Sequence, residues 1–127
     1  MLYVALAFAG LAALLHVYIF VLESLRWEAP ATREVFGTTP EVAAATRPLA
    51  FNQGFYNLFL AIVTALGIGL VGVDRHVALT LVCTGAGSML AAALVLVLSD
   101  ATKARAALIQ GAFPLICLLD LLVWALQ

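Results

Sequence analysis

Four long apolar stretches follow one another along the chain, and three polar segments separate them. Each stretch is close to the ~20 residues that a helix needs to cross a hydrocarbon core of ~30 Å. The stretches lack the alternation of β-strands, and backbone polar groups inside lipid need internal partners, so we expect helices. The predicted spans are residues 2–25, 51–73, 77–98 and 104–126.

Composition supports a membrane protein. Of 127 residues, 65% are hydrophobic and only 10% are charged, whereas soluble domains are near half apolar and a quarter charged. The first stretch has no basic residue before it and is too long for a signal peptide, so we expect a permanent span. Short second and third connections make consecutive helices antiparallel. The prediction is one transmembrane domain over residues 1–127, an all-α, integral membrane four-helix up-down bundle.

The polar segments differ in length. Residues 26–50 hold three prolines and most of the charges, so we expect a structured loop with at most short helices. Residues 74–76 form a tight turn, and Ser99 or Asp100 is the expected N-cap before the fourth helix.

Basic residues predict the orientation. The first and third connections carry five of them, and the opposite side has only Arg75. Because basic residues favour the cytoplasmic side, we expect these two connections in the cytoplasm and both termini outside. The five basic residues are Arg26, Arg33, Arg47, Lys103 and Arg105.

Several other classes of protein are disfavoured. The net charge is −1, so no basic face for nucleic acid is expected. Cys83 and Cys117 lie in apolar runs without C-x-x-C spacing, which favours buried thiols over a disulfide. His16 and Glu23 lie on the opposite membrane side from His76 and form no ligand motif, so neither a metal nor another cofactor is expected.

The informative residues are polar groups at membrane depth. Seven residues separate His16 from Glu23, which places them within ~20° of each other on a helix. The predicted topology collects polar groups from all four helices in the cytoplasmic half of the bundle. We expect a shared cavity there, with these candidate residues: His16, Glu23, Arg26, Trp27, Arg47, Asn52, Gln53, Tyr56, Asn57 and Gln110.

Structural explanations stand beside this prediction. In this second interpretation, Glu23 and Arg26 form an interfacial ion pair, and His16 bonds to the carbonyl of a neighbouring helix. Asn52 is then an N-cap, and Trp27 is an interface anchor. Gln110 has the weakest such explanation, because an amide within a span needs a partner.

A set of short motifs resembles a known family. The motifs are Glu23-x-x-Arg26-Trp27, Val35-Phe36-Gly37, Asn52-Gln53-Gly54-Phe55-Tyr56-Asn57, and Gln110-Gly111 with Pro114. Together they resemble the small bacterial membrane proteins grouped as domain of unknown function 1304, over essentially the whole chain. The resemblance implies a compact four-helix protein of the bacterial inner membrane, without an established reaction.

The leading functional hypothesis is an intramembrane enzyme or binding protein for an apolar, isoprenoid-like or lipid substrate. Glu23 and His16 would handle protons, in an isomerisation, a cyclisation or an epoxide opening without a cofactor. Arg26 and Arg47 would hold an anionic head group. The polar side chains of the second and fourth helices would orient the substrate.

Two alternatives belong to other classes, and a homo-oligomer is possible in each. A proton-coupled transporter would resemble the small multidrug exporters, although Glu23 lies at a helix end instead of the midplane. An accessory subunit would bind a larger membrane complex through its small-residue faces.

Overall fold

The computed structural model describes all 127 residues, and every regular element in it is helical. Four of its helical segments are long and apolar enough to cross a membrane, which confirms the predicted all-α, four-helix membrane fold. The elements in chain order are α1 (Leu2–Phe20), a π-helical turn (Val21–Leu25), α2 (Pro30–Phe36), α3 (Pro40–Leu70), α4 (Arg75–Ser99), a 3₁₀ turn (Ala101–Lys103) and α5 (Ala104–Ala125).

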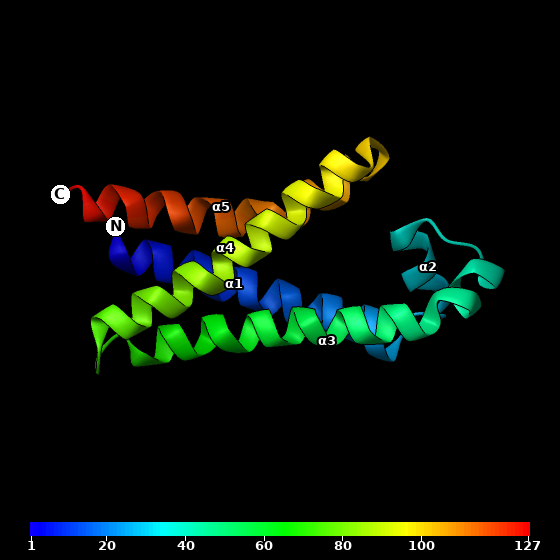
Figure 1. Ribbon diagram of the computed structural model, residues 1–127, viewed down its shortest axis with the longest axis horizontal. Coiled ribbons are helices and arrows are strands. Elements are labelled where there is room, and N and C mark those ends of the chain that lie inside the picture. Colours follow the sequence, from blue (N-terminus) through cyan, green and yellow to red (C-terminus); the bar gives the residue numbers. More distant parts are fainter.

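The four long helices form a closed ring. α1 packs against α3 and α5, and α4 packs against the same two helices, so α1 and α4 lie diagonally opposite. Both termini and the α3–α4 turn lie at one end of the bundle (Figure 1). The α4–α5 connection lies toward the other end, where Lys103 Nζ donates a 3.2 Å hydrogen bond to the Phe36 carbonyl of α2. The first and third connections therefore share one end, as the topology predicts, and we call it the α2 end.

The start of the second span corrects the sequence prediction. We expected a loop over residues 26–50, but α3 begins at Pro40 and contains Pro48. Thr39 is the N-cap, since its hydroxyl accepts a 3.3 Å hydrogen bond from Val42 N, and proline suits the first turn because its missing N–H has no helical partner there. The apolar run thus marks only the lipid-facing part of a longer helix, and the N-cap prediction for Asn52 is wrong.

The remaining helix ends lie within a few residues of prediction, but the tight turn expected at residues 74–76 lies at residues 71–74, because α3 ends at Leu70 and α4 begins at Arg75. Asp74 caps α4, with its carboxylate accepting a 3.1 Å hydrogen bond from Val77 N. Asp100, one of the two expected caps, accepts hydrogen bonds from Thr102 N at 3.0 Å and from Thr102 Oγ1 at 2.6 Å. These bonds stabilise the carboxylate and lower the pKa of Asp100.

Small residues set the distances between helices. A Cβ on Gly67 of α3 would lie 2.8 Å from the Ala78 carbonyl oxygen of α4, and one on Gly111 of α5 would lie 3.0 Å from Ala93 Cβ of α4. Ala5 of α1 is completely buried. Lipid chains are as apolar as leucine, so the hydrophobic effect adds little to the association of membrane helices. Close backbone packing of this kind provides the attraction between them instead.

Candidate functional site

Glu23 lies in the π-helical turn that ends the first span. Its residue is only 5% exposed, and its carboxylate oxygen Oε2 accepts a 2.9 Å hydrogen bond from Asn57 Nδ2 of α3. No protein group donates a hydrogen bond to the other oxygen, Oε1. A π turn holds one more residue than an α turn and often occurs at functional sites. A buried carboxyl that has only a neutral amide as its partner is costly in a membrane protein, which makes Glu23 the leading functional candidate.

A close approach between α1 and α3 produces this contact. A Cβ on Gly54 would overlap the Ser24 hydroxyl and would lie 2.9 Å from Ser24 N. Ser24 Oγ donates a 2.7 Å hydrogen bond to the Phe51 carbonyl, and the rings of Phe20 and Phe55 meet edge to face with centroids 5.1 Å apart. Only glycine at position 54 allows the π turn to lie this close to α3.

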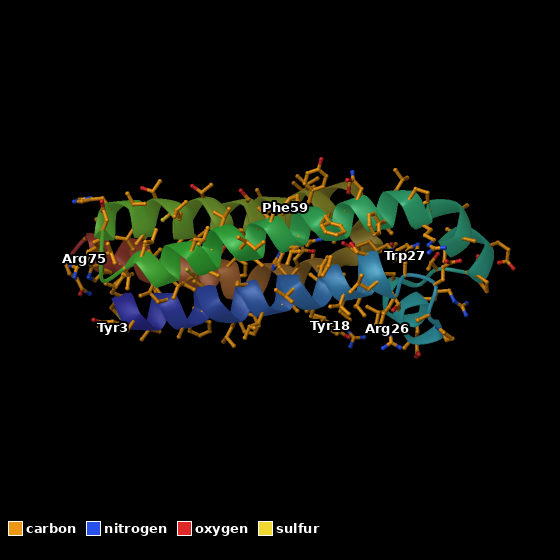
Figure 2. The ribbon with its side chains drawn as sticks, turned by 90° about the horizontal axis from the view of Figure 1, so that it is seen from below. Tyr3, Tyr18, Arg26, Trp27, Phe59 and Arg75 are labelled. Atoms are coloured by element: carbon orange, nitrogen blue, oxygen red, sulfur yellow. The ribbon has the colours of Figure 1, made fainter.

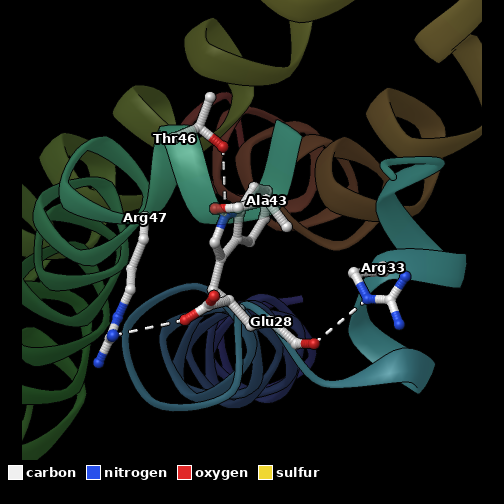
Figure 3. Close-up of polar contacts among 6 residues, drawn as sticks. Glu28, Arg33, Ala43, Thr46 and Arg47 are labelled. Atoms are coloured by element: carbon white, nitrogen blue, oxygen red, sulfur yellow. Dashed lines mark hydrogen bonds and ion pairs between the residues drawn. The ribbon is translucent and has the colours of Figure 1, made fainter. Parts of the chain in front are cut away.

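Trp27 fixes the chain beyond the π turn. Its indole Nε1–H is shared between the Ala43 carbonyl at 3.0 Å and Thr46 Oγ1 at 3.2 Å, both on the first turns of α3 (Figure 3). Its ring meets that of Phe36 with centroids 5.0 Å apart. Trp27 is therefore the contact that holds α2 and the start of α3 together, beyond the interface anchor that its sequence position suggested.

An ion pair borders the same region. Arg47 Nη1 of α3 lies 3.4 Å from Glu28 Oε2, and both side chains are largely exposed. The Glu28 carbonyl accepts a 3.2 Å hydrogen bond from Arg33 Nε (Figure 3). Arg26 is exposed and forms no ion pair, so the predicted pairing of Glu23 with Arg26 is wrong. Figure 2 shows Arg26 and Trp27 at the α2 end of the molecule, far from Tyr3 and Arg75 at the other end.

These residues enclose a pocket of about 220 Å³ at the α2 end, lined by the segment from Glu23 to Ala29 and by Arg47. We call it the Glu23 pocket. It brings together four of the ten predicted site residues: Glu23, Arg26, Trp27 and Arg47. Asn57 supports it from α3 through its bond to Glu23.

The other predicted residues do not join this pocket. Asn52, Gln53 and Tyr56 are exposed on α3. Gln110 is half-buried on α5, forms no side-chain hydrogen bond and does not line the Glu23 pocket. The prediction that polar groups of all four helices share one cavity is therefore wrong. The orientation of α3 about its axis turns only some of the polar side chains near its middle toward α1.

His16 is completely buried about two turns from Glu23, toward the middle of α1. Its Nδ1 lies 2.9 Å from the Ala12 carbonyl oxygen. A carbonyl can only accept, so Nδ1 carries the hydrogen. The expectation of a bond to a neighbouring helix is wrong, since this carbonyl belongs to α1 itself. Nε2 has no hydrogen-bond partner, and no hydrogen bond joins His16 to Glu23.

Sequence reasoning missed several residues of the site. Ser24, Gly54 and Thr46 received no role, although a glycine inside an apolar helix is a known sign of close backbone approach. Glu28 was also missed, and nothing in the sequence paired it with Arg47. The π turn left no recognisable signal in the residue pattern.

Comparison with known proteins identifies the family of the chain. Residues 10–122 match the model of the family described as Protein of unknown function (DUF1304). The chain belongs to this family. The matched region of this DUF1304 protein contains Glu23, the whole Glu23 pocket and the α3 residues that support it. No curated protein and no solved structure gives a significant match.

Proposed function

We propose that this DUF1304 protein binds an amphipathic, lipid-like molecule at one face of the membrane and acts on its polar end by acid–base chemistry. The proposal rests on the surroundings of the Glu23 carboxyl group. Its carboxyl group is almost completely buried, lines a pocket of about 220 Å³, and has only the neutral Asn57 amide as a protein partner. Intramembrane ionisable residues of this kind typically mark substrate sites.

Glu23 is the proposed proton-handling residue. Asn57 occupies Oε2 and holds the carboxyl in place, so Oε1 is the atom free to exchange a proton with a ligand. A ligand group within ~2.6–3.2 Å of Oε1 would be in reach for this transfer. In an isomerisation, Glu23 would take a proton from one carbon of the substrate and return a proton to another, which leaves no net change in the protein.

The arginines give the mouth of the pocket a positive charge. Arg26 has no carboxylate partner in the protein, and Arg47 shares its charge with the exposed Glu28. A phosphate or similar anionic group on the ligand would find guanidinium donors here. We therefore propose an alcohol or phosphate ester as the polar end, with an isoprenoid or acyl chain in the membrane.

The proposal is tested with protein in lipid nanodiscs. Farnesol and farnesyl phosphate are the probes, and Glu23→Gln is compared with Glu34→Gln, which alters an exposed carboxyl of α2 outside the pocket. We expect Glu23→Gln to weaken the binding of farnesol ~10–100-fold, since a hydrogen bond to a buried charged group contributes about 1.5–3 kcal/mol. Glu34→Gln should stay within ~2-fold. Equal binding by wild type and Glu23→Gln would remove Glu23 from the site.

Turnover needs its own measurement. In D₂O, acid–base chemistry at the substrate predicts incorporation of deuterium into the bound isoprenoid by the wild type and not by Glu23→Gln. Binding without any incorporation would reduce the function to binding alone.

Proton-coupled transport is the second candidate, and His16 favours it. A buried imidazole nitrogen without a partner, on the same helix as Glu23, is a possible second station for a proton. Proteoliposomes with and without a pH gradient distinguish the two functions, because only a transporter requires the gradient. The accessory-subunit alternative predicts a stoichiometric protein partner after purification in mild detergent.

A further inference from the structure

The Glu23 pocket is lined by two acidic and two basic side chains, and only two of the four are paired with each other. Arg47 Nη1 lies 3.4 Å from Glu28 Oε2, and this is the only ion pair in the molecule. Glu23 and Arg26 line the same pocket, and neither has an ion partner. The pocket therefore presents one unpaired carboxyl group and one unpaired guanidinium group.

The local backbone explains why Glu23 and Arg26 do not pair. Residues three positions apart are neighbours on a regular α-helix. Glu23 instead lies inside the π turn, and Arg26 follows that turn with φ −133° and ψ 24°, outside helical geometry. Glu23 is buried and held by Asn57, whereas Arg26 is exposed. The carboxyl group thus lies deep in the pocket, and the guanidinium group lies at its mouth.

The end of the first span adds negative charge next to Glu23. None of the carbonyl oxygens from Leu22 to Leu25 accepts a hydrogen bond from a backbone N–H. Helix carbonyls point toward the C-terminal end, which carries roughly half a negative charge, and the residues that follow this end line the pocket. A buried carboxyl group beside free carbonyls is costly unless a cation or a hydrogen-bond donor reaches it. An ammonium group supplies both, since it carries a positive charge and three N–H donors.

We propose that the Glu23 pocket binds the zwitterionic head group of a lipid, a phosphate ester that carries a primary amine. Its ammonium group lies at Glu23 and its phosphate at Arg26. The inference rests on the proposed function, because it concerns the same pocket, and it specifies the polar end of the ligand. The ammonium group is then the group that exchanges a proton with Glu23 Oε1.

Charge complementarity favours a zwitterion over simpler ligands. The charges of the four side chains cancel, so the pocket has no excess of either sign to attract a ligand of net charge. A metal ion at Glu23 would leave Arg26 without a partner, and a phosphate without an amine would leave Glu23 without one. A phosphodiester with a primary amine pairs with both groups at once, through charge-assisted hydrogen bonds at each end.

Native mass spectrometry in mild detergent tests the inference. The probes are phosphatidylethanolamine and its N-acetyl derivative with the same acyl chains, which keeps the phosphate and lacks the ammonium group. We expect the wild type to retain the amine lipid at least ~10-fold more than the N-acetyl lipid, as the loss of a hydrogen bond between charged groups predicts.

Three variants assign this preference to its residues. Glu23→Gln should bring the ratio of the two lipids close to one, and Glu34→Gln, on the exposed surface of α2, should leave it unchanged. Arg26→Gln should lower the retention of both lipids and keep their ratio, because both carry the phosphate. A preference that persists in Glu23→Gln would come from the size of the acetyl group and would overturn the assignment of the ammonium group.

The outcomes separate the inference from the proposed function. If the wild type retains both lipids equally and Glu23→Gln retains neither, the ammonium group is wrong and the proposed function stands. If retention of neither lipid depends on Glu23, both are wrong. Free phosphoethanolamine, added as a competitor, distinguishes the source of the head group. Displacement of the lipid at an equal concentration would overturn a lipid as the ligand.

Discussion

Asn57 on α3 donates a hydrogen bond of 2.9 Å to the carboxylate of Glu23 in the π turn that follows α1. The two residues are 34 positions apart in sequence and meet where the π turn faces the middle of α3. This contact fixes the only carboxyl of the first span within the Glu23 pocket. It joins the fold to the proposed chemistry, since the same amide that stabilises the bundle also positions the proton-handling group.

Replacement of Asn57 by alanine should destabilise the protein. It leaves the buried Glu23 without a partner, at an expected cost of about 1–3 kcal/mol in the free energy of unfolding. Thermal unfolding in detergent measures the loss. Asn52→Ala is the matched control on the same helix, because Asn52 is exposed and its replacement should change stability by no more than ~0.5 kcal/mol. Similar losses for both variants would show that the Glu23–Asn57 contact contributes nothing.

Gly54→Ala should separate α1 from α3. The added methyl group overlaps Ser24, so the helices must move apart, at a cost of about 1–3 kcal/mol. Gly69→Ala is the control on the same helix, since nothing lies within 4 Å of its added Cβ. There alanine should be neutral or stabilise the helix by up to ~1 kcal/mol. Chemical denaturation of both variants checks the difference, and a tolerated Gly54→Ala would contradict the close approach.

Asp100 provides a prediction for pH. Its hydrogen bonds from Thr102 lower the pKa of the folded state, so the cap stabilises the protein above the ordinary pKa of aspartate. This contribution is lost as the pH falls through the lowered pKa. Carboxyl ¹³C NMR in micelles should show Asp100 titrating below its usual range, and Thr102→Val should shift the titration upward. An unchanged titration in the variant would rule out the Thr102 hydroxyl as a cause of the lowered pKa.

The orientation of the bundle also has a direct test. After Cys83 and Cys117 are replaced by alanine, single cysteines are introduced as Glu34→Cys on α2 and Gln127→Cys at the C-terminus. The excess of basic residues at the α2 end predicts that an impermeant maleimide labels Gln127→Cys on intact spheroplasts. Glu34→Cys should react only after lysis. The reverse pattern would place the Glu23 pocket on the outer face.

The four long helices were predictable from the sequence because a membrane span must be apolar over the whole thickness of the hydrocarbon core. The sequence predicted the wrong start for α3 because the apolar run begins at Phe51, whereas the helix begins with the Thr39-Pro40 cap. This cap is recognisable in the sequence, because Thr39 followed by Pro40 and Glu41 is a common signal for the start of a helix. Prolines are also frequent in loops, which is why the segment before Phe51 resembles a loop in sequence.

The site was predictable only in part. Glu23, Asn57 and Trp27 stood out as costly or amphipathic groups in an apolar chain. Their partners depend on the rotation of α3 about its axis, and the length of an apolar stretch does not determine this rotation. The sequence therefore groups Asn52, Gln53 and Tyr56 with Asn57, although these three residues face away from the Glu23 pocket. The π turn changes the helical phase beyond Phe20, so a seven-residue spacing did not establish that His16 and Glu23 act together.

Native mass spectrometry of protein extracted from its own membrane in mild detergent tests the central claim most directly. The wild type should retain a lipid-like adduct near one per chain, Glu34→Gln should retain the same adduct, and Glu23→Gln should lose most of it. Identical adducts on the wild type and on Glu23→Gln would contradict the assignment of the Glu23 pocket as a ligand site.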